Sequence, residues 1–220
     1  MGIAQFLPMV LQTPAAALGF KELAGSLCSL SKMADSYRSI TRLGALVDLL
    51  SPEKMASLTN NRDPVGRRLG ILEYLAVISY FPCEHVAVMH HFGILTDTKY
   101  ARFGGLAVFF WFWSLVFGLL RSTYQALLAY PYVTWNTTDT ASVKRKADFK
   151  KLLTTALKQL CFLIFSTTCI KKAPQLLTSP QGVLMPLHVA VERLAPPVVN
   201  MPDALRGLLG TIATLCDVLG

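Results

Sequence analysis

Charged residues are scarce in this chain of 220 residues. Asp, Glu, Lys and Arg together make up 15%, against about 25% in ordinary soluble domains, whereas apolar residues make up 53%. A chain this apolar is not intrinsically disordered, and its composition excludes collagen and a coiled coil. Length and composition favour one membrane domain over residues 1–220, or else an unusually apolar helical domain.

Sequence motifs that carry chemistry are also lacking. The five cysteines form no Cys-x-x-Cys pair, so we expect neither a disulfide framework nor a structural zinc site. The densest ionisable cluster consists of Glu84, His85, His90 and His91. Its spacing does not reproduce the H-E-x-x-H zinc helix, and no nucleophile elbow, phosphate-binding loop or dinucleotide-binding turn occurs. We therefore predict no catalytic residue, no metal site, no cofactor and no enzymatic activity.

Positive charge is concentrated in one part of the chain. The net charge is +8, and the stretch from Arg121 to Lys172 holds nine basic and two acidic residues. A basic segment beside apolar helices suits anionic lipid head groups, because the attraction grows with each Lys or Arg. Since no nucleic-acid-binding motif is visible, we predict membrane lipids, and not nucleic acid, as partners.

The clearest structural signal is an uncharged run over residues 103–120, bracketed by Arg102 and Arg121. As a helix it would span about 27 Å, close to the thickness of the hydrocarbon core of a bilayer. The aromatic cluster from Phe109 to Trp113 makes this run apolar on every side. We predict a transmembrane helix here.

The N-terminal region over residues 20–50 has a different pattern. Its apolar residues recur every three or four positions, with Lys, Arg and Ser between them, which is typical of an amphipathic helix or helix pair. This region is too charged to span a bilayer but could lie in the interface. The side chains predicted to insert are Phe20, Leu23, Leu27, Leu30 and Tyr37. Periodicity alone fits equally well a helix packed against others in the same domain.

Two further helical regions flank the predicted span. In the region 63–100, Asp63-Pro64 marks a helix start and Pro82 is expected to interrupt or end that helix. The region 144–172 is predicted to be a basic amphipathic helix, interfacial or partly embedded. Its basic residues are predicted to serve membrane contact or targeting. They are Lys144, Arg145, Lys146, Lys150 and Lys151.

The last part of the chain divides into a connector and a short helix. Residues 174–202 carry six of the twelve prolines and are predicted to be irregular. Residues 205–220 form an apolar, glycine-rich segment, which is either a short membrane helix or a helix docked on the rest of the protein. Gly207, Gly210 and Ala213 are small enough to allow close helix–helix packing. The whole chain is thus predicted to be an all-α membrane protein.

Three segments carry a resemblance to a known family. Residues 72–86, LEYLAVISYFPCEHV, are followed by Gly93-Ile94-Leu95, residues 207–215 read GLLGTIATL, and residues 36–44 read SYRSITRLG. In order and spacing they resemble the peroxin-eleven family of peroxisomal membrane proteins, and within it the chain is similar to the glycosomal members of kinetoplastids. The apolar run over residues 1–20 is interpreted as an extension outside this family pattern.

The resemblance implies an integral protein of the peroxisomal membrane, or of the glycosomal membrane in a kinetoplastid. It implies that the protein promotes elongation, proliferation and fission of the organelle through insertion of an amphipathic helix, self-association and contact with the fission machinery. Two alternatives are a small-solute channel in the same membrane and a membrane-bound lipid-metabolising enzyme that uses Glu84 and His85.

Overall fold

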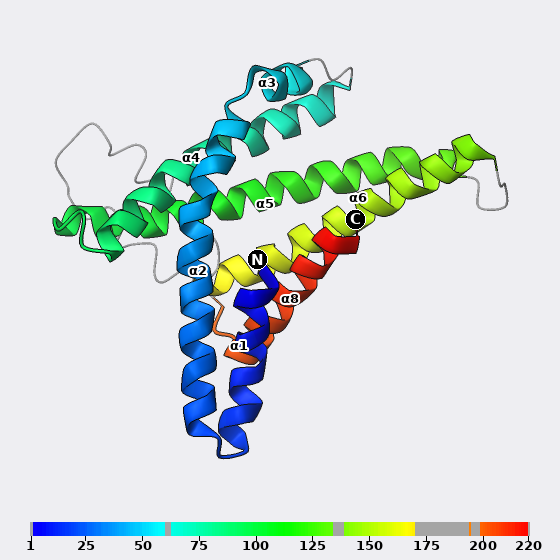
Figure 1. Ribbon diagram of the computed structural model, residues 1–220. Coiled ribbons are helices and arrows are strands. Elements are labelled where there is room, and N and C mark those ends of the chain that lie inside the picture. The colour runs from blue at the N-terminus through cyan, green and yellow to red at the C-terminus, as the bar shows by residue number, and fades with distance from the viewer. Residues whose placement is uncertain (1, 60–62, 134–138, 170–193, 195–198, 220) are drawn as a thin grey trace.

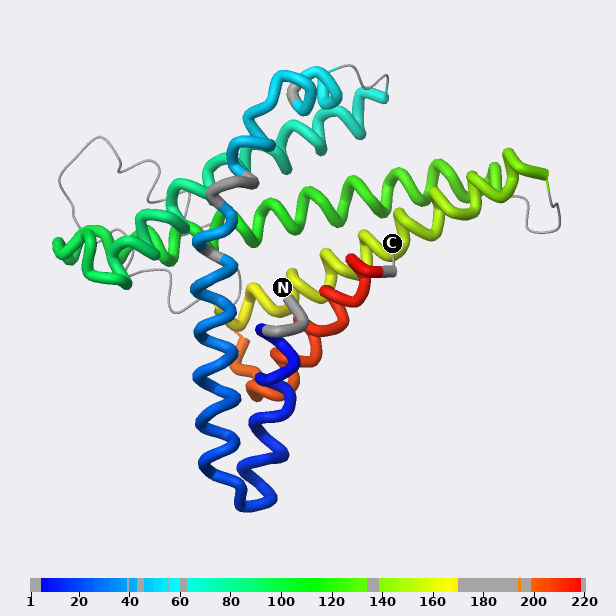
Figure 2. Tube along the Cα trace, in the orientation of Figure 1, coloured from blue at the N-terminus to red at the C-terminus, as the bar shows by residue number. Residues whose placement is uncertain are grey.

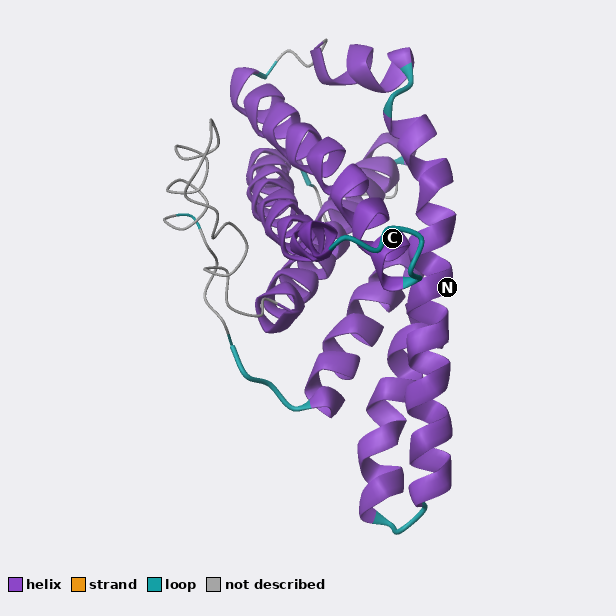
Figure 3. Ribbon diagram, turned by 90° about the vertical axis from the view of Figure 1, so that its left-hand side faces the viewer, coloured by secondary structure: helices purple, strands orange, loops and turns teal. Residues whose placement is uncertain are grey.

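The part of the chain that the structure describes is helical. The computed structural model describes residues 2–59, 63–133, 139–169, 194 and 199–219, and these ranges contain helices and connecting segments but no strand (Figure 3). In chain order the elements are α1 (Gly2–Ala17), α2 (Lys21–Leu49), α3 (Pro52–Thr59), α4 (Pro64–His91), η1 (Thr98–Ala101), α5 (Arg102–Ala129), η2 (Tyr130–Tyr132), α6 (Thr140–Cys169) and α8 (Asp203–Leu219). The predicted all-α class is confirmed. The predicted connector over residues 174–202 lies almost entirely outside the described residues.

Helices α1 and α2 form an antiparallel hairpin that projects beyond the other helices (Figure 2). The turn depends on Gly19, whose φ of 88° is a backbone conformation that glycine adopts readily. The Phe20 amide donates to the Ala15 carbonyl at 2.9 Å and the Gly19 amide to the Ala16 carbonyl at 3.1 Å, which is the Schellman pattern of a helix end. The apolar N-terminal run is therefore a helix of the fold and packs against α2 and α8.

Helix α4 begins where the sequence predicts. Asp63 is its N-cap, and its carboxylate accepts from the Gly66 amide at 2.7 Å and from the Val65 amide at 3.3 Å. Pro64 occupies the first turn, where its missing N–H leaves no bond unmade. The dipeptide thus supplies both the cap and the first helical residue.

The prediction that Pro82 interrupts or ends this helix is wrong. Helix α4 continues through Pro82 to His91. A proline removes one backbone donor but leaves the hydrogen bonds on either side in place, and an apolar environment offers the backbone no better partner than its own helix. The helix ends at a second Schellman turn, in which Gly93 has a φ of 73°.

Helices α4, α5 and α6 form the main bundle (Figure 1). Each runs antiparallel to the next, so the C-terminal ends of α4 and α6 lie near the N-terminal end of α5. At the other end of the bundle, Ala126 and Val133 pack with Phe149 in a small core. Helix α8 lies against both α6 and α1, and α2 packs on α1 and α4. In Figure 1, α2 points in a direction very different from that of α5.

Three helical segments among the described residues are long and apolar enough to cross a membrane. They are Pro64–His91, Thr98–Tyr132 and Thr140–Cys169. The predicted span over residues 103–120 lies inside the second, and the other two go beyond the single clear span expected from the sequence. The 17-residue helix α8 is not among the three.

The outer surface of these segments is apolar. Large exposed side chains are found on all three, among them Leu75 on α4, Leu120 on α5 and Leu157 on α6. A soluble protein of this size rarely exposes so much apolar surface, whereas lipid tails are a suitable environment for it. The exposed leucines therefore fit an integral membrane protein.

Candidate functional site

One face of α2 is apolar and exposed. Leu23 is 53% exposed, Met33 65% and Tyr37 53%, and Phe20, Leu30 and Ile40 are exposed as well. From Leu23 onward these side chains recur at helical spacing along several turns. Leu27, the remaining member of the predicted stripe, is only partly exposed and lies toward the face that packs on α1.

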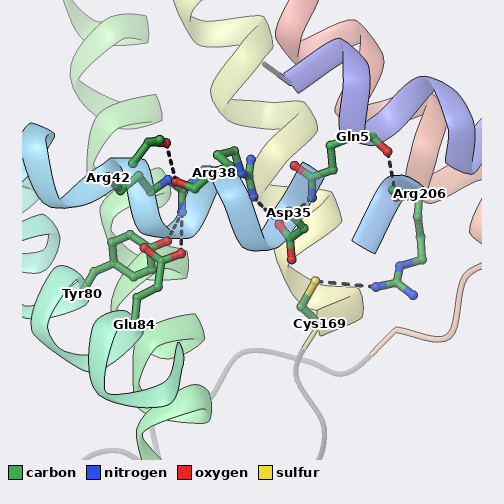
Figure 4. Close-up of polar contacts among 10 residues, drawn as sticks. Gln5, Asp35, Arg38, Arg42, Tyr80, Glu84, Cys169 and Arg206 are labelled. Carbon is green, nitrogen blue, oxygen red and sulfur yellow. Dashed lines mark hydrogen bonds and ion pairs between the residues drawn. The ribbon is translucent and has the colours of Figure 1, made fainter. Parts of the chain in front are cut away.

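The opposite face of α2 is polar and holds the helix to α4. Arg42 donates from Nη1 to the Glu84 Oε1 at 2.6 Å and also to the Tyr80 hydroxyl (Figure 4). The Arg42 guanidinium also lies over the Tyr80 ring, with 5.7 Å between Cζ and the ring centroid. Since the Glu84 side chain is only 13% exposed, this is a partly desolvated ion pair, which is stronger than one in open water.

A second polar group joins α2 to α1. The Gln5 side-chain amide donates to the Asp35 carboxylate at 2.7 Å, and the Ser31 hydroxyl donates to the Gln5 carbonyl at 2.8 Å. Arg38 pairs with the same carboxylate at 3.1 Å (Figure 4). Burial lowers the pKa of the Arg38 guanidinium, and the neighbouring positive charge of Arg42 lowers this pKa further.

An aromatic cluster lies beside these polar groups, where α1, α5 and α6 meet. The Phe6 ring is 5.5 Å from the Phe165 ring, and Trp111 is 6.1 Å from Phe165. Two arginines lie over this cluster: Arg38 over Phe6 and Arg206 over Phe165, each with 5.6 Å between Cζ and the ring centroid. Stacking on a ring leaves the edge of a guanidinium free to donate hydrogen bonds.

The polar groups and the aromatic cluster line an open cavity of about 620 Å³. It lies where α4 ends, α5 begins, α6 ends and α8 begins, with α2 as one wall. The charged side chains that line it are Lys32, Asp35, Arg38, Arg42, Glu84 and Arg206. Cations outnumber carboxylates in this lining by four to two, which gives the cavity a positive potential.

The small residues of α8 pack against α1. A Cβ on Gly210 would lie 2.2 Å from the Phe6 ring, and one on Gly207 would lie 2.8 Å from the Val10 backbone nitrogen. Ala213 is fully buried. The close approach for which the sequence predicts these residues thus occurs within the chain, between α8 and the N-terminal helix.

The predicted basic cluster lies at the opposite end of the bundle from the cavity. It occupies the first three turns of α6. Lys144, Arg145, Lys150 and Lys151 are exposed and Lys146 is partly exposed. Their arrangement offers a broad positive surface and no enclosed site.

A further polar group lies inside the bundle, between the three candidate spans. Arg121 of α5 pairs with Glu73 of α4, with 3.2 Å between Nε and Oε2. The Ser122 hydroxyl donates to the Gln159 side-chain oxygen of α6 at 2.7 Å. Gly118 makes room for these groups, because a Cβ there would lie 2.3 Å from the Gln159 amide nitrogen. The Arg121 and Glu73 side chains are 33% and 21% exposed, so this pair faces mainly protein.

Glu84 and His85 do not act together. Glu84 faces Arg42, whereas His85 is buried with Nδ1 2.6 Å from the Phe81 carbonyl. His90 contacts the Leu95 carbonyl at 2.7 Å. Among the described residues no group of three or more His, Cys, Asp and Glu side chains is arranged to hold a metal ion.

Of the charged residues that line the cavity, sequence reasoning singled out only Glu84, and not for this site. Arg38 and Arg42 are four residues apart on α2, and Tyr80 and Glu84 are four apart on α4. Each pair shares one helix face, and this spacing of polar side chains was the signal that the sequence offered. Arg206 gave no comparable signal, because its place depends on how α8 packs.

Comparison with known proteins gives a family match. The family model described as Peroxisomal biogenesis factor 11 (PEX11) matches residues 3–219. No curated protein and no solved structure matches the chain.

The match covers nearly the whole chain and confirms the resemblance carried by the three sequence segments. It includes the N-terminal run, so interpreting that run as an extension outside the family pattern is wrong. The likeness to glycosomal members of kinetoplastids stays a prediction. The chain therefore belongs to the peroxisomal biogenesis factor 11 family, as an integral protein of the peroxisomal membrane with a role in peroxisome biogenesis and proliferation.

Proposed function

We propose that this protein elongates and helps to divide peroxisomes mechanically, by seating the apolar face of α2 among the lipids of one leaflet. The observation that carries the proposal is the row of exposed apolar side chains on α2, which includes Leu23, Leu30, Met33 and Tyr37. Inserting such a helix enlarges one leaflet relative to the other, and the membrane bends to relieve the difference.

The energy and the orientation of α2 both support this mechanism. Transferring a leucine-sized side chain fully out of water contributes roughly 1.5–3 kcal/mol, so half-exposed side chains over several turns hold the helix in the interface. In Figure 1, α2 points in a direction very different from that of α5. When α5 crosses the bilayer, α2 lies along the membrane surface, and Arg42 fastens it to α4.

Self-association and contact with the fission machinery belong to the same proposal. One wedge perturbs only a few lipids, so curvature requires many copies to gather. The exposed basic side chains of α6 provide attraction to anionic lipids or a targeting signal, at about 1 kcal/mol for each charge near the surface. The engagement of Glu84 by Arg42 and of His85 by a backbone carbonyl supports a mechanism without catalysis.

The test replaces two exposed leucines by charges. Leu23→Glu with Leu30→Glu should leave the purified full chain folded and embedded through its spans, but unable to tubulate liposomes or elongate peroxisomes on overexpression. Leu23→Met with Leu30→Met is the matched control, since it keeps the apolar area. A double-glutamate variant of normal abundance that still elongates peroxisomes would overturn the wedge.

A second candidate function is conduction of small solutes. The observation that favours it is the polar group of Glu73, Arg121 and Gln159 between the three candidate spans. If it lines a pathway, Gln159→Leu should change the conductance of planar bilayers that contain the full chain. If the group only holds the helices together, the wild-type chain should show no conductance.

A further inference from the structure

The cavity between the hairpin and the bundle has the charge of an anion site. Four cationic side chains and two carboxylates are among its described lining residues. Apolar walls surround these groups, and charges act more strongly on a ligand in such surroundings than in open water. The excess positive charge favours a negatively charged ligand over a neutral or cationic one.

Two of the arginines have unused donors. In the described part of the chain, the Nε atoms of Arg38 and Arg206 are buried and have no hydrogen-bond partner. Arg206 donates with Nη1 to Asp203 at 3.1 Å, but its Nη2 meets only the Cys169 sulfur at 3.7 Å, which is a weak acceptor. Phosphate oxygens would match these guanidinium edges, because they accept two parallel N–H bonds from one arginine.

The rest of the cavity is apolar. Trp111 and Val108 of α5 and Phe165 of α6 line the side that faces the bundle. The volume of about 620 Å³ lies within the range of sites for small organic ligands and exceeds what a lone inorganic phosphate fills. A ligand with both a charged and an apolar part satisfies both kinds of wall.

The position of the cavity indicates where such a ligand comes from. The cavity lies at the ends of the three candidate spans, between the last turns of α4 and α6 and the first turns of α5. At the ends of membrane-spanning helices lie the lipid head groups. An amphipathic anion at this level is a phospholipid of the surrounding leaflet.

We propose that this cavity is a binding site for one anionic phospholipid, with Arg38 and Arg206 as ligands of the phosphate and with Trp111 and Phe165 against the glycerol and the upper acyl chains. Arg42 keeps α2 in place as the wall of the site through its bond to Glu84. The site is distinct from the wedge, because it uses the inward face of α2 and the wedge uses the outward face.

The experiment measures binding of short-chain phosphatidic acid to the purified full chain in detergent. Trp113→Phe with Trp135→Phe leaves Trp111 as the only tryptophan, so its fluorescence reports the cavity. We expect saturation at one lipid per chain. Diacylglycerol, which has the same acyl chains and no phosphate, should not bind, and inorganic phosphate should compete at least about 100-fold more weakly than the lipid.

Charge variants give a second, independent readout. Arg38→Gln and Arg206→Gln should each weaken lipid binding by about 10- to 100-fold, as expected for lost hydrogen bonds to a charged group. Arg67→Gln with Arg68→Gln removes two exposed positive charges from the first turns of α4, away from the cavity, and should leave binding unchanged. Circular dichroism and thermal unfolding verify that each variant is folded.

Three different results would overturn the proposal. Equal loss in the Arg67→Gln/Arg68→Gln control would indicate attraction to general surface charge. Inorganic phosphate binding as tightly as the lipid would assign the cavity to a soluble phosphate compound. Binding of diacylglycerol equal to that of phosphatidic acid would exclude the arginines as its basis. None of these results depends on whether α2 bends membranes.

Discussion

The two ends of the α4–α5–α6 bundle hold their positive charge in different ways. At the cavity end, three arginines from α2 and α8 stack on rings or pair with carboxylates. At the other end, the basic side chains of α6 extend from its first turns and are mostly exposed. If α4, α5 and α6 all cross the membrane, as their length and composition allow, these two ends lie at its opposite faces.

The buried arginines of one end and the exposed, mostly lysine side chains of the other suit different kinds of anion binding. Arginine keeps its charge when buried and offers a rigid set of donors, so it suits a site with a defined ligand. Lysine on a flexible stem attracts any anionic surface, and this attraction is screened by salt. We expect specific recognition at the cavity end and general adhesion at the basic end.

We expect the largest effect from a substitution that disrupts the cavity end of the bundle and leaves the other end folded. Gly210→Val places carbon atoms where the Phe6 ring lies, so α8 and α1 can no longer pack closely. Overpacking costs typically 1–3 kcal/mol and more when backbone must move, and here it should detach the hairpin and destroy the cavity. Limited proteolysis should then cut α1 and α2 first, while the α5–α6 end around Phe149 stays protected.

Gly25→Ala is the control for this change. Gly25 lies on α2 with nothing within 4 Å of an added Cβ, so alanine there should be neutral or slightly stabilising. If Gly210→Val unfolds the protein no more easily than Gly25→Ala, the packing of α8 on α1 is not what holds the cavity end together.

The next effect concerns the basic end. Replacing Lys144, Arg145, Lys146, Lys150 and Lys151 by Gln should weaken binding to vesicles with anionic lipids by between three and four orders of magnitude at low salt, given about 1 kcal/mol for each charge. The wild-type binding should fall steeply with salt and that of the variant only weakly. A variant with arginine at the four lysines keeps the charge and should bind normally. Unchanged binding or targeting of the glutamine variant would contradict this role.

The smallest effect compares two ion pairs. Glu84→Gln removes the carboxylate that faces Arg42 across the α2–α4 contact, where both side chains are largely buried, and should lower the stability by about 1–3 kcal/mol. Asp203→Asn removes the partner of Arg206 in a pair whose carboxylate is 54% exposed, and should cost less than about 1 kcal/mol. Thermal unfolding in detergent measures both. Equal losses would mean that the α2–α4 pair has no special part in fastening the hairpin.

The sequence predicted most of the helices but little of the cavity. The start of α4 at Asp63-Pro64 and the uncharged run within α5 depend on residues that are close in sequence. The prediction that Pro82 interrupts or ends α4 was wrong, because a single proline does not end a helix whose backbone has no alternative hydrogen-bond partner. The cavity brings together Arg38, Glu84 and Arg206. These residues are far apart in the sequence and meet only through tertiary packing.

The most direct test of the wedge is the depth of α2 in the membrane. An environment-sensitive fluorescent amino acid is incorporated at residue 33, on the apolar face, or at residue 21, on the polar face, of the full chain in liposomes. If α2 lies in the leaflet, brominated acyl chains should quench the probe at residue 33 and aqueous iodide should quench the probe at residue 21. Quenching of both probes by iodide alone would show that α2 does not enter the leaflet and would contradict the account.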